Sequence, residues 1–343
     1  MDQSTTPTLE DVARAAGVST ATVSRCLNMP DKVVAATRER VMIAVRDLGY
    51  SPNFGARVLA AKRTNTIGAV IPTMENSIFA LGLQAFQEEL QAQGRTLLVA
   101  SSAYNPELED RQIRALVARG ADALLLIGHD RDAAIYGFLD RQNVPYVVTW
   151  AHDPTEKVCS VGFDNLAGMR DMAKVVLALG HQRVGVISAP MAGNDRARLR
   201  VAGIRAALDG VGLPPEAMQV VEAPYSIDAA AMATRSLLDA SPRPTVIMCG
   251  NDVQAAGVVR QVKSMGLRVP HDVSVTGFDD MELARVVDPA ITTVAVAHPE
   301  MGRLAARHLI AMVNGETPPR SSEVATRIVH RASLAHPSNV APD

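Results

Sequence analysis

The first fifty residues carry their apolar side chains at the spacing of amphipathic helices. Three stretches show this pattern: residues 8–17, 19–28 and 37–49. The first two are separated only by a tight turn, and each begins with a residue that can cap a helix. Three short helices joined in this way are typical of a helix-turn-helix unit. The pattern therefore predicts a small all-α head over residues 1–50.

The second of these helices presents small polar groups and one arginine, Arg25, on the side away from its apolar stripe. Small side chains let a helix sit deep in a DNA major groove, and a guanidinium can donate two parallel hydrogen bonds to a guanine edge. Ser19 and Thr22 lie near the helix N-terminus, where they are placed to bind phosphate. A three-helix interaction module with a solvated Arg25 would show the same pattern, so the residues alone leave both interpretations open.

Residues 51–64 connect the head to the rest of the chain. Pro52 cannot continue a helix, and Asn53 can cap a new one of about two turns. A helix this short is marginal on its own and needs a partner. We expect either a hinge helix or a plain linker here.

From residue 65 onward, short apolar strands alternate with amphipathic helices, and the alternation restarts after residue 163. Such alternation with short loops is typical of a doubly wound parallel sheet. The expected fold is therefore α/β, with a helix-turn-helix head joined by a hinge to two lobes within residues 65–343. We expect one lobe over residues 65–162 with 292–325, and the other over approximately 163–291.

Ligands of such sheets bind outside the carboxyl ends of the strands, which between two lobes means the cleft. Polar residues stand at these ends: Asp164, Asn251 and Asp279. Carboxylates, amides, arginines and aromatic rings together suit a small polyhydroxylated molecule. For each Asp or Asn the alternative is a helix N-cap. Other candidates at or near strand ends and on the helix that follows are Ile78, Phe79, Trp150 and Arg200, while Arg196 and Arg198 are expected to be peripheral.

Charge is distributed unevenly along the chain. Residues 1–66 hold nine basic and six acidic side chains, a net charge of +3, and the remainder carries −5. A basic head on an acidic body points weakly to an anionic partner for the head. The three cysteines are far apart and the first residues lack a secretory signal, so we expect a reducing, cytoplasmic location and no membrane span.

The sequence offers no pattern of an enzyme. It holds no GxSxG, P-loop or HExxH motif, and Asp279 and Asp280 are neighbours whose side chains would point to opposite faces of a strand. We therefore predict no catalysis and no cofactor.

Residues 8–28 and 37–72 resemble the LacI/GalR family of bacterial transcription repressors, and the resemblance extends over essentially the whole chain. It implies that a hinge helix pairs with its copy in a homodimer and that Leu59 wedges into the minor groove of operator DNA. It places base reading on Thr20, Ala21 and Arg25, although Phe54–Gly55 departs from the usual hinge pattern. The expected DNA-contacting residues are Ser19, Thr20, Ala21, Thr22, Ser24, Arg25, Asn28, Asn53, Arg57 and Leu59.

The resemblance also implies a cleft that binds a sugar or sugar derivative. It assigns effector contacts to Asp164, Arg200, Asn251 and Asp279, and a pocket lining to Trp150, Phe79 and Phe278. The expected function is a repressor whose lobes close on an effector and so alter the pairing of two hinge helices. The alternatives are a sugar-binding protein of a transporter and a regulator whose effector is a protein.

Overall fold

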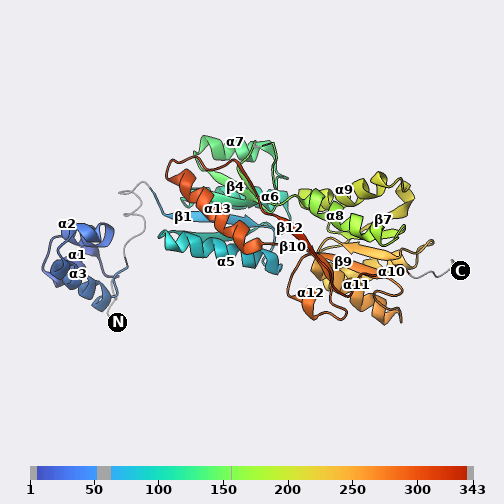
Figure 1. The fold of residues 1–343 in the computed structure, drawn as a ribbon. Coiled ribbons are helices and arrows are strands. Elements are labelled where there is room, and N and C mark those ends of the chain that lie inside the picture. Colours follow the sequence, from blue (N-terminus) through green and yellow to red (C-terminus); the bar gives the residue numbers. More distant parts are fainter. Residues whose placement is uncertain (1–5, 52–62, 156, 338–343) are drawn as a thin grey trace. The chain divides into compact units, whose positions relative to one another are not determined.

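The computed structural model describes residues 6–51, 63–155 and 157–337. The chain divides into two compact units, Met1–Thr64 and Asn65–Asp343. Figure 1 labels most of the helices and several of the strands of both.

The first unit contains the three expected helices, α1 (Leu9–Ala16), α2 (Thr20–Asn28) and α3 (Ala35–Asp47). Thr8 and Asp11 form a capping box at the start of α1, and Gly17 ends that helix with a left-handed φ of 64°. The buried side chains all come from the apolar stripes of the three helices. They are Val12, Ala13, Ala16, Val23, Cys26, Val41 and Ala44.

The second unit contains two sheets of six strands each. The first sheet has the order β11-β5-β4-β3-β1-β2, and all its strands are parallel. Four helices flank it: α5 (Ser77–Ala92), α6 (Pro106–Ala118), α7 (Ala133–Arg141) and α13 (His298–Val313). The strands are β1 (Thr66–Ile71), β2 (Thr96–Ser101), β3 (Ala123–Ile127), β4 (Tyr146–Thr149), β5 (Ser160–Gly162) and β11 (Ser321–Glu323).

The second sheet has the order β12-β10-β9-β8-β6-β7, with β12 antiparallel to β10. The strands are β6 (Val184–Ser188), β7 (Met218–Glu222), β8 (Val246–Cys249), β9 (Ser274–Asp279), β10 (Thr292–Val296) and β12 (Thr326–Val329). The accompanying helices are α8 (Asn165–Ala178), α9 (Asp195–Gly210), α10 (Ile227–Leu238), α11 (Asp252–Ser264) and α12 (Leu283–Val286).

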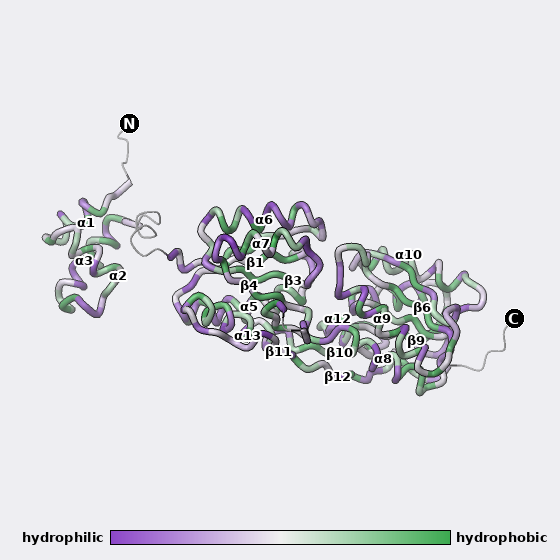
Figure 2. Tube along the Cα trace, turned by 90° about the horizontal axis from the view of Figure 1, so that it is seen from above, coloured by the Kyte–Doolittle hydropathy of each residue, from purple (hydrophilic) through white to green (hydrophobic). Residues whose placement is uncertain are grey.

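Each sheet is covered by helices on both faces, which confirms the doubly wound α/β fold. Helices α5 and α13 pack together on one face of the first sheet, while α6 and α7 share a separate apolar core on the other. In the second sheet, α8 packs with α9 on one face and α10 with α11 on the other. Figure 2 shows the hydrophobic strands lying inside these layers.

The chain passes three times between the lobes, and one crossing differs from the expected boundary. The first lobe was expected to include residues 292–325, but β10 pairs in parallel with β9 of the second sheet. The chain returns to the first lobe only after Val296, and β12 then rejoins the second sheet. All of β10 is buried, and it lies between β9 and β12 of the second sheet, a pairing between distant strands that its own sequence does not decide.

The elements of the second lobe that were not expected from the sequence include β7 and α10. Strand β7 lies at the end of its sheet and alternates buried or half-buried with exposed positions. It therefore lacks the continuous apolar run that marks the inner strands. Among the described residues, no helix is long and apolar enough to cross a membrane.

Candidate functional site: a helix-turn-helix and a pocket between two lobes

Helix α2 is anchored by its apolar side and leaves its polar side open. Ser19 caps the helix: its hydroxyl accepts a hydrogen bond from the Thr22 N–H at 3.2 Å and lies 3.0 Å from the Thr22 hydroxyl. Val23 and Cys26 are buried in the head. Arg25 is exposed on the outer side.

The exposed side of α2 holds most of the sequence-based DNA candidates. Ser19, Thr20 and Ala21 are exposed like Arg25, and Thr22 and Ser24 are half-buried. The arrangement fits a helix that enters a groove with its N-terminal half. Asn53, Arg57 and Leu59 lie outside the described residues, as does the side chain of Asn28.

In the second unit, a narrow pocket lies between the two lobes, and we call it the first pocket. Its walls come from loops at the carboxyl ends of strands of both sheets, from the first turn of α5 and from the first two turns of α9. It combines four aromatic rings with two arginines and one carboxylate. The lining residues are Asn76, Ile78, Phe79, Tyr104, Trp150, Arg196, Arg200, Tyr225 and Asp279.

Arg200 is the most firmly held polar group of the first pocket. Its Nε donates to Asn165 Oδ1 at 2.9 Å, and its Nη1 donates to the Gly250 carbonyl. The guanidinium carbon lies 3.8 Å from the centre of the Phe278 ring. Asn165 in turn donates to the Trp150 carbonyl at 3.0 Å. These contacts fix the guanidinium before any ligand arrives.

Asp279 has a buried carboxylate whose hydrogen-bonding capacity is unused. Its side chain is 0% exposed, and neither oxygen accepts a hydrogen bond from any described residue. The nearest side-chain nitrogens are Arg200 Nη2 at 3.6 Å and His298 Nε2 at 3.7 Å. Burial lowers the pKa of His298 and outweighs the neighbouring Asp279 carboxylate, which raises it, so the neutral imidazole is favoured. A buried carboxylate that accepts no hydrogen bond is costly even beside a guanidinium, so it marks a place for ligand donors.

The aromatic wall is built around Trp150. Its ring centre lies 5.2 Å from that of Phe79, and its ring stacks on His298 at 6.1 Å. A Cβ at Gly82 would lie 2.6 Å from the indole, so only glycine leaves room for it there. The indole Nε1 is buried and has no partner among the described residues. A ligand can therefore receive both a stacking surface and a hydrogen bond from this residue.

Three lining residues have backbone conformations that residues other than glycine rarely adopt. Tyr104, Trp150 and Asp279 have φ values of 56°, 60° and 99°. Such strain costs free energy and tends to cluster where function requires it. Each follows or ends a strand, so the strain turns its side chain toward the pocket at the carboxyl end of a sheet.

The sequence-based ligand candidates divide into two groups. Ile78, Phe79, Trp150, Arg200 and Asp279 line the first pocket, and Phe278 is buried beneath Arg200. Asp164 and Asn251 do not line it. Their side-chain oxygens cap helices α8 and α11, accepting from the Ala167 and Gln254 N–H groups.

Four lining residues were missed or set aside. Arg196 was expected to be peripheral, but it lies on the same side of α9 as Arg200, one turn earlier, and lines the pocket. The spacing of four residues was the signal that could have identified it. Asn76, Tyr104 and Tyr225 were not considered, although the two tyrosines follow β2 and β7.

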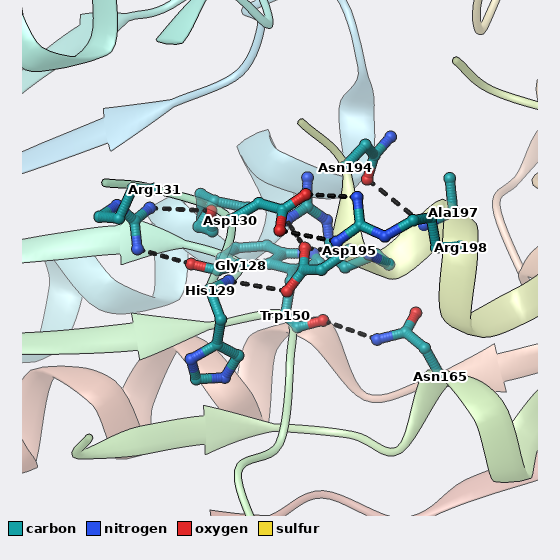
Figure 3. Close-up of polar contacts among 12 residues, drawn as sticks. Gly128, His129, Asp130, Arg131, Trp150, Asn165, Asn194, Asp195, Ala197 and Arg198 are labelled. Carbon is teal, nitrogen blue, oxygen red and sulfur yellow. Dashed lines mark hydrogen bonds and ion pairs between the residues drawn. The ribbon is translucent and has the colours of Figure 1, made fainter. Parts of the chain in front are cut away.

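Polar contacts join the two lobes beside the pocket (Figure 3). The His129 N–H donates to Asp195 Oδ2 at 2.7 Å. The guanidinium of Arg198 binds both carboxylate oxygens of Asp130, at 2.5 and 2.6 Å. A Cβ at Gly128 would lie 1.8 Å from Arg196 Nη1, so glycine permits this close approach. Burial raises the pKa of Asp195, but Arg196 and the His129 N–H outweigh it and the pKa is lowered.

Comparison with known proteins supports both halves of this description. A model of bacterial regulatory proteins of the lacI family matches residues 8–53, and one of periplasmic binding protein-like domains matches residues 173–334. The HTH-type transcriptional repressor CytR of Escherichia coli K12 is 32% identical over 317 residues, which is 92% of each chain.

Solved structures give the same result. A transcriptional regulator CelR–cellobiose complex matches with a TM-score of 0.70 and 31% identity, covering 96% of this chain and 100% of that one. The lac repressor dimer bound to operator and the anti-inducer ONPF matches with a TM-score of 0.85 and 27% identity, over 96% and 100%. The helix-turn-helix, the two doubly wound lobes and the extent of these matches lead to one conclusion: the chain belongs to the lacI family of bacterial regulatory proteins.

Proposed function

We propose that this protein is a transcription repressor whose affinity for operator DNA is set by a carbohydrate bound in the first pocket. The observation that carries the proposal is the Asp279 carboxylate, buried without hydrogen-bond partners among the described residues and facing an aromatic wall. Vicinal hydroxyls would satisfy its two oxygens, and an apolar sugar face would cover Phe79 or Trp150.

The mechanism follows from the position of the pocket between the lobes. An effector that contacts Arg200 and Asp279 from one lobe and Phe79 from the other favours one lobe arrangement over another. The effector changes operator affinity by the difference in its own affinity for the two arrangements. In this proposal the chain performs no catalytic step and works where its operator lies, in the cytoplasm.

The rival functions explain less of the chain. A sugar-binding protein of a transporter would leave the helix-turn-helix head without a role. A regulator with a protein effector would leave the unsatisfied carboxylate of Asp279 unexplained.

The direct test is fluorescence anisotropy with a labelled DNA fragment from upstream of the protein's own gene, with and without each of a panel of sugars. We expect specific binding that at least one sugar strengthens or weakens. Failure to bind any such fragment at low ionic strength, whatever sugar is present, would overturn the proposal.

We also propose a homodimer, because an operator with two half-sites requires two heads. The first lobe has an apolar surface at its outermost strand: Leu98 and Val99 on β2 and Leu81 on α5 are exposed. Patches of this kind are typical of subunit contacts. The lac repressor structure is itself described as a dimer.

Replacing Leu98 with glutamate should therefore give a monomer. A charge buried in an apolar contact is strongly unfavourable, so we expect the mass in analytical ultracentrifugation to halve at micromolar concentration. Val211→Glu changes an equally apolar, exposed residue on the second lobe and serves as the control. A Leu98→Glu protein with the mass of a dimer would exclude this surface.

The Arg198–Asp130 pair joins the two lobes outside the first pocket, so it should contribute to the affinity of an effector held in that pocket. Its side chains are 45% and 29% exposed, so we assign it no more than about 1 kcal/mol. With Arg198→Glu, we expect roughly five-fold weaker effector binding in calorimetry, because the closed lobes are less populated. The double variant Asp130→Arg, Arg198→Glu should recover most of the loss, and a double variant as weak as the single one would contradict the role of the pair.

A further inference from the structure

A second, narrow pocket adjoins the first. It lies over the carboxyl ends of β1, β2 and β3 of the first lobe, and Gly193 closes it from the second lobe. Tyr104 and Arg196 line both pockets. A ligand that filled both would therefore pass along these two side chains.

Tyr104 and Arg196 form the wall that the two pockets share. Tyr104 has a strained, left-handed backbone, and its ring pairs across the cleft with Tyr225 at 6.2 Å. Arg196 is only 7% exposed, and Asp195 holds its Nη1 at 3.0 Å. Arg196 is thus held within its own lobe, whereas Tyr104 is 38% exposed and contacts the other lobe through Tyr225.

The two pockets differ in chemistry. The first offers aromatic faces, whereas the second offers Ser102, Asn105, Glu109 and Asp130, with Tyr104 as its one aromatic lining residue. The two carboxylates are held in place by arginines: Glu109 by Arg131 at 2.9 Å and Asp130 by Arg198. Each carboxylate still has lone pairs that can accept hydroxyl hydrogens.

This lining selects the kind of group that can enter. The three arginines at this pocket are each paired with a carboxylate, Arg131 with Glu109, Arg198 with Asp130 and Arg196 with Asp195, so their charges are already compensated and favour a phosphate or a sugar acid little. With Tyr104 as its one aromatic lining residue, the pocket offers little stacking surface to an apolar ring or a nucleobase. A neutral unit rich in hydroxyl groups fits, because it donates to the carboxylates and to Ser102 Oγ and accepts from Arg196.

We propose that the effector is a neutral disaccharide, with one ring in the first pocket and the second ring in the pocket lined by Ser102, Glu109 and Asp130. The proposal rests on the proposed function, since it extends the same binding site. It makes Tyr104 and Arg196 the residues that contact the effector near the bond between its two rings.

The test compares monosaccharides with the disaccharides that contain them, using the full-length protein in calorimetry. Suitable sets are glucose with maltose and cellobiose, galactose with lactose and melibiose, and xylose with xylobiose. We expect one disaccharide to bind at least ten-fold more tightly than its component sugar. If a monosaccharide binds as tightly as every disaccharide that contains it, the second pocket holds no second ring and the disaccharide proposal is wrong. The proposed function would stand. If no sugar of the panel binds, the carbohydrate effector itself is wrong.

A variant that fills the second pocket sharpens the comparison. Ser102→Met puts a longer, flexible side chain at the end of β2, so we expect the advantage of the disaccharide to fall at least ten-fold. Binding of the monosaccharide in the first pocket reports that the variant is folded. Ser101→Met, at the neighbouring position that lines neither pocket, is the matched control and should keep the wild-type advantage. An advantage unchanged in Ser102→Met would overturn the proposal.

Discussion

An Asp279→Asn protein will bind its operator as tightly as the effector-free wild type, but it will no longer respond to effector. The carboxylate can accept hydrogen bonds from two ligand hydroxyls, and each bond to a charged group contributes about 1.5–3 kcal/mol. The amide keeps one acceptor and presents a donor where the ligand also donates. Effector affinity should therefore fall roughly 10²-fold or more.

The measurement is operator binding by anisotropy at increasing effector concentration, together with calorimetry of the effector alone. Asp280→Asn is the matched control, because the neighbouring carboxylate binds Arg331 and does not line the first pocket. A normal response in Asp279→Asn would remove the central contact from the proposed mechanism.

The second large effect is expected from Arg25→Ala in α2. A bidentate contact between arginine and guanine discriminates by about 1–3 kcal/mol, so operator affinity should fall roughly 5- to 150-fold. Binding to unrelated DNA should change much less, since phosphate contacts supply most of that affinity.

Arg14→Ala provides the control for charge. Arg14 is also an exposed arginine of the head, but it lies on α1 and pairs with Asp11. Anisotropy with operator and scrambled duplexes at two salt concentrations separates the two effects. An equal loss on both duplexes in Arg25→Ala would mean that Arg25 contacts phosphate rather than base.

The fold could be predicted largely from local signals. The capping box at Thr8 and the helix stop at Gly17 are local, and so is the alternation of apolar strands with amphipathic helices. The return of β10 to the second sheet is different, because an apolar strand pairs equally well in either sheet as far as its own sequence is concerned. Pairing between distant strands decides such a boundary.

The residues of the first pocket could be predicted only in part. The rule that ligands gather at strand ends identified Trp150 and Asp279. It could not separate them from Asp164 and Asn251, because an Asp or Asn after a strand caps a helix equally well. Tyr225 depended on β7, whose half-exposed pattern did not reveal a strand.

The three passages of the chain between the lobes have a consequence for synthesis. Strands β11 and β12 each close one side of a sheet, and both lie within the last stretch of the described chain. While the ribosome is still making residues 321–329, β5 and the fully buried β10 each lack a neighbour. Exposed strands of this kind invite aggregation. A nascent or truncated chain that stops before residue 321 would thus expose an unpaired strand edge in each lobe and be prone to aggregation through both.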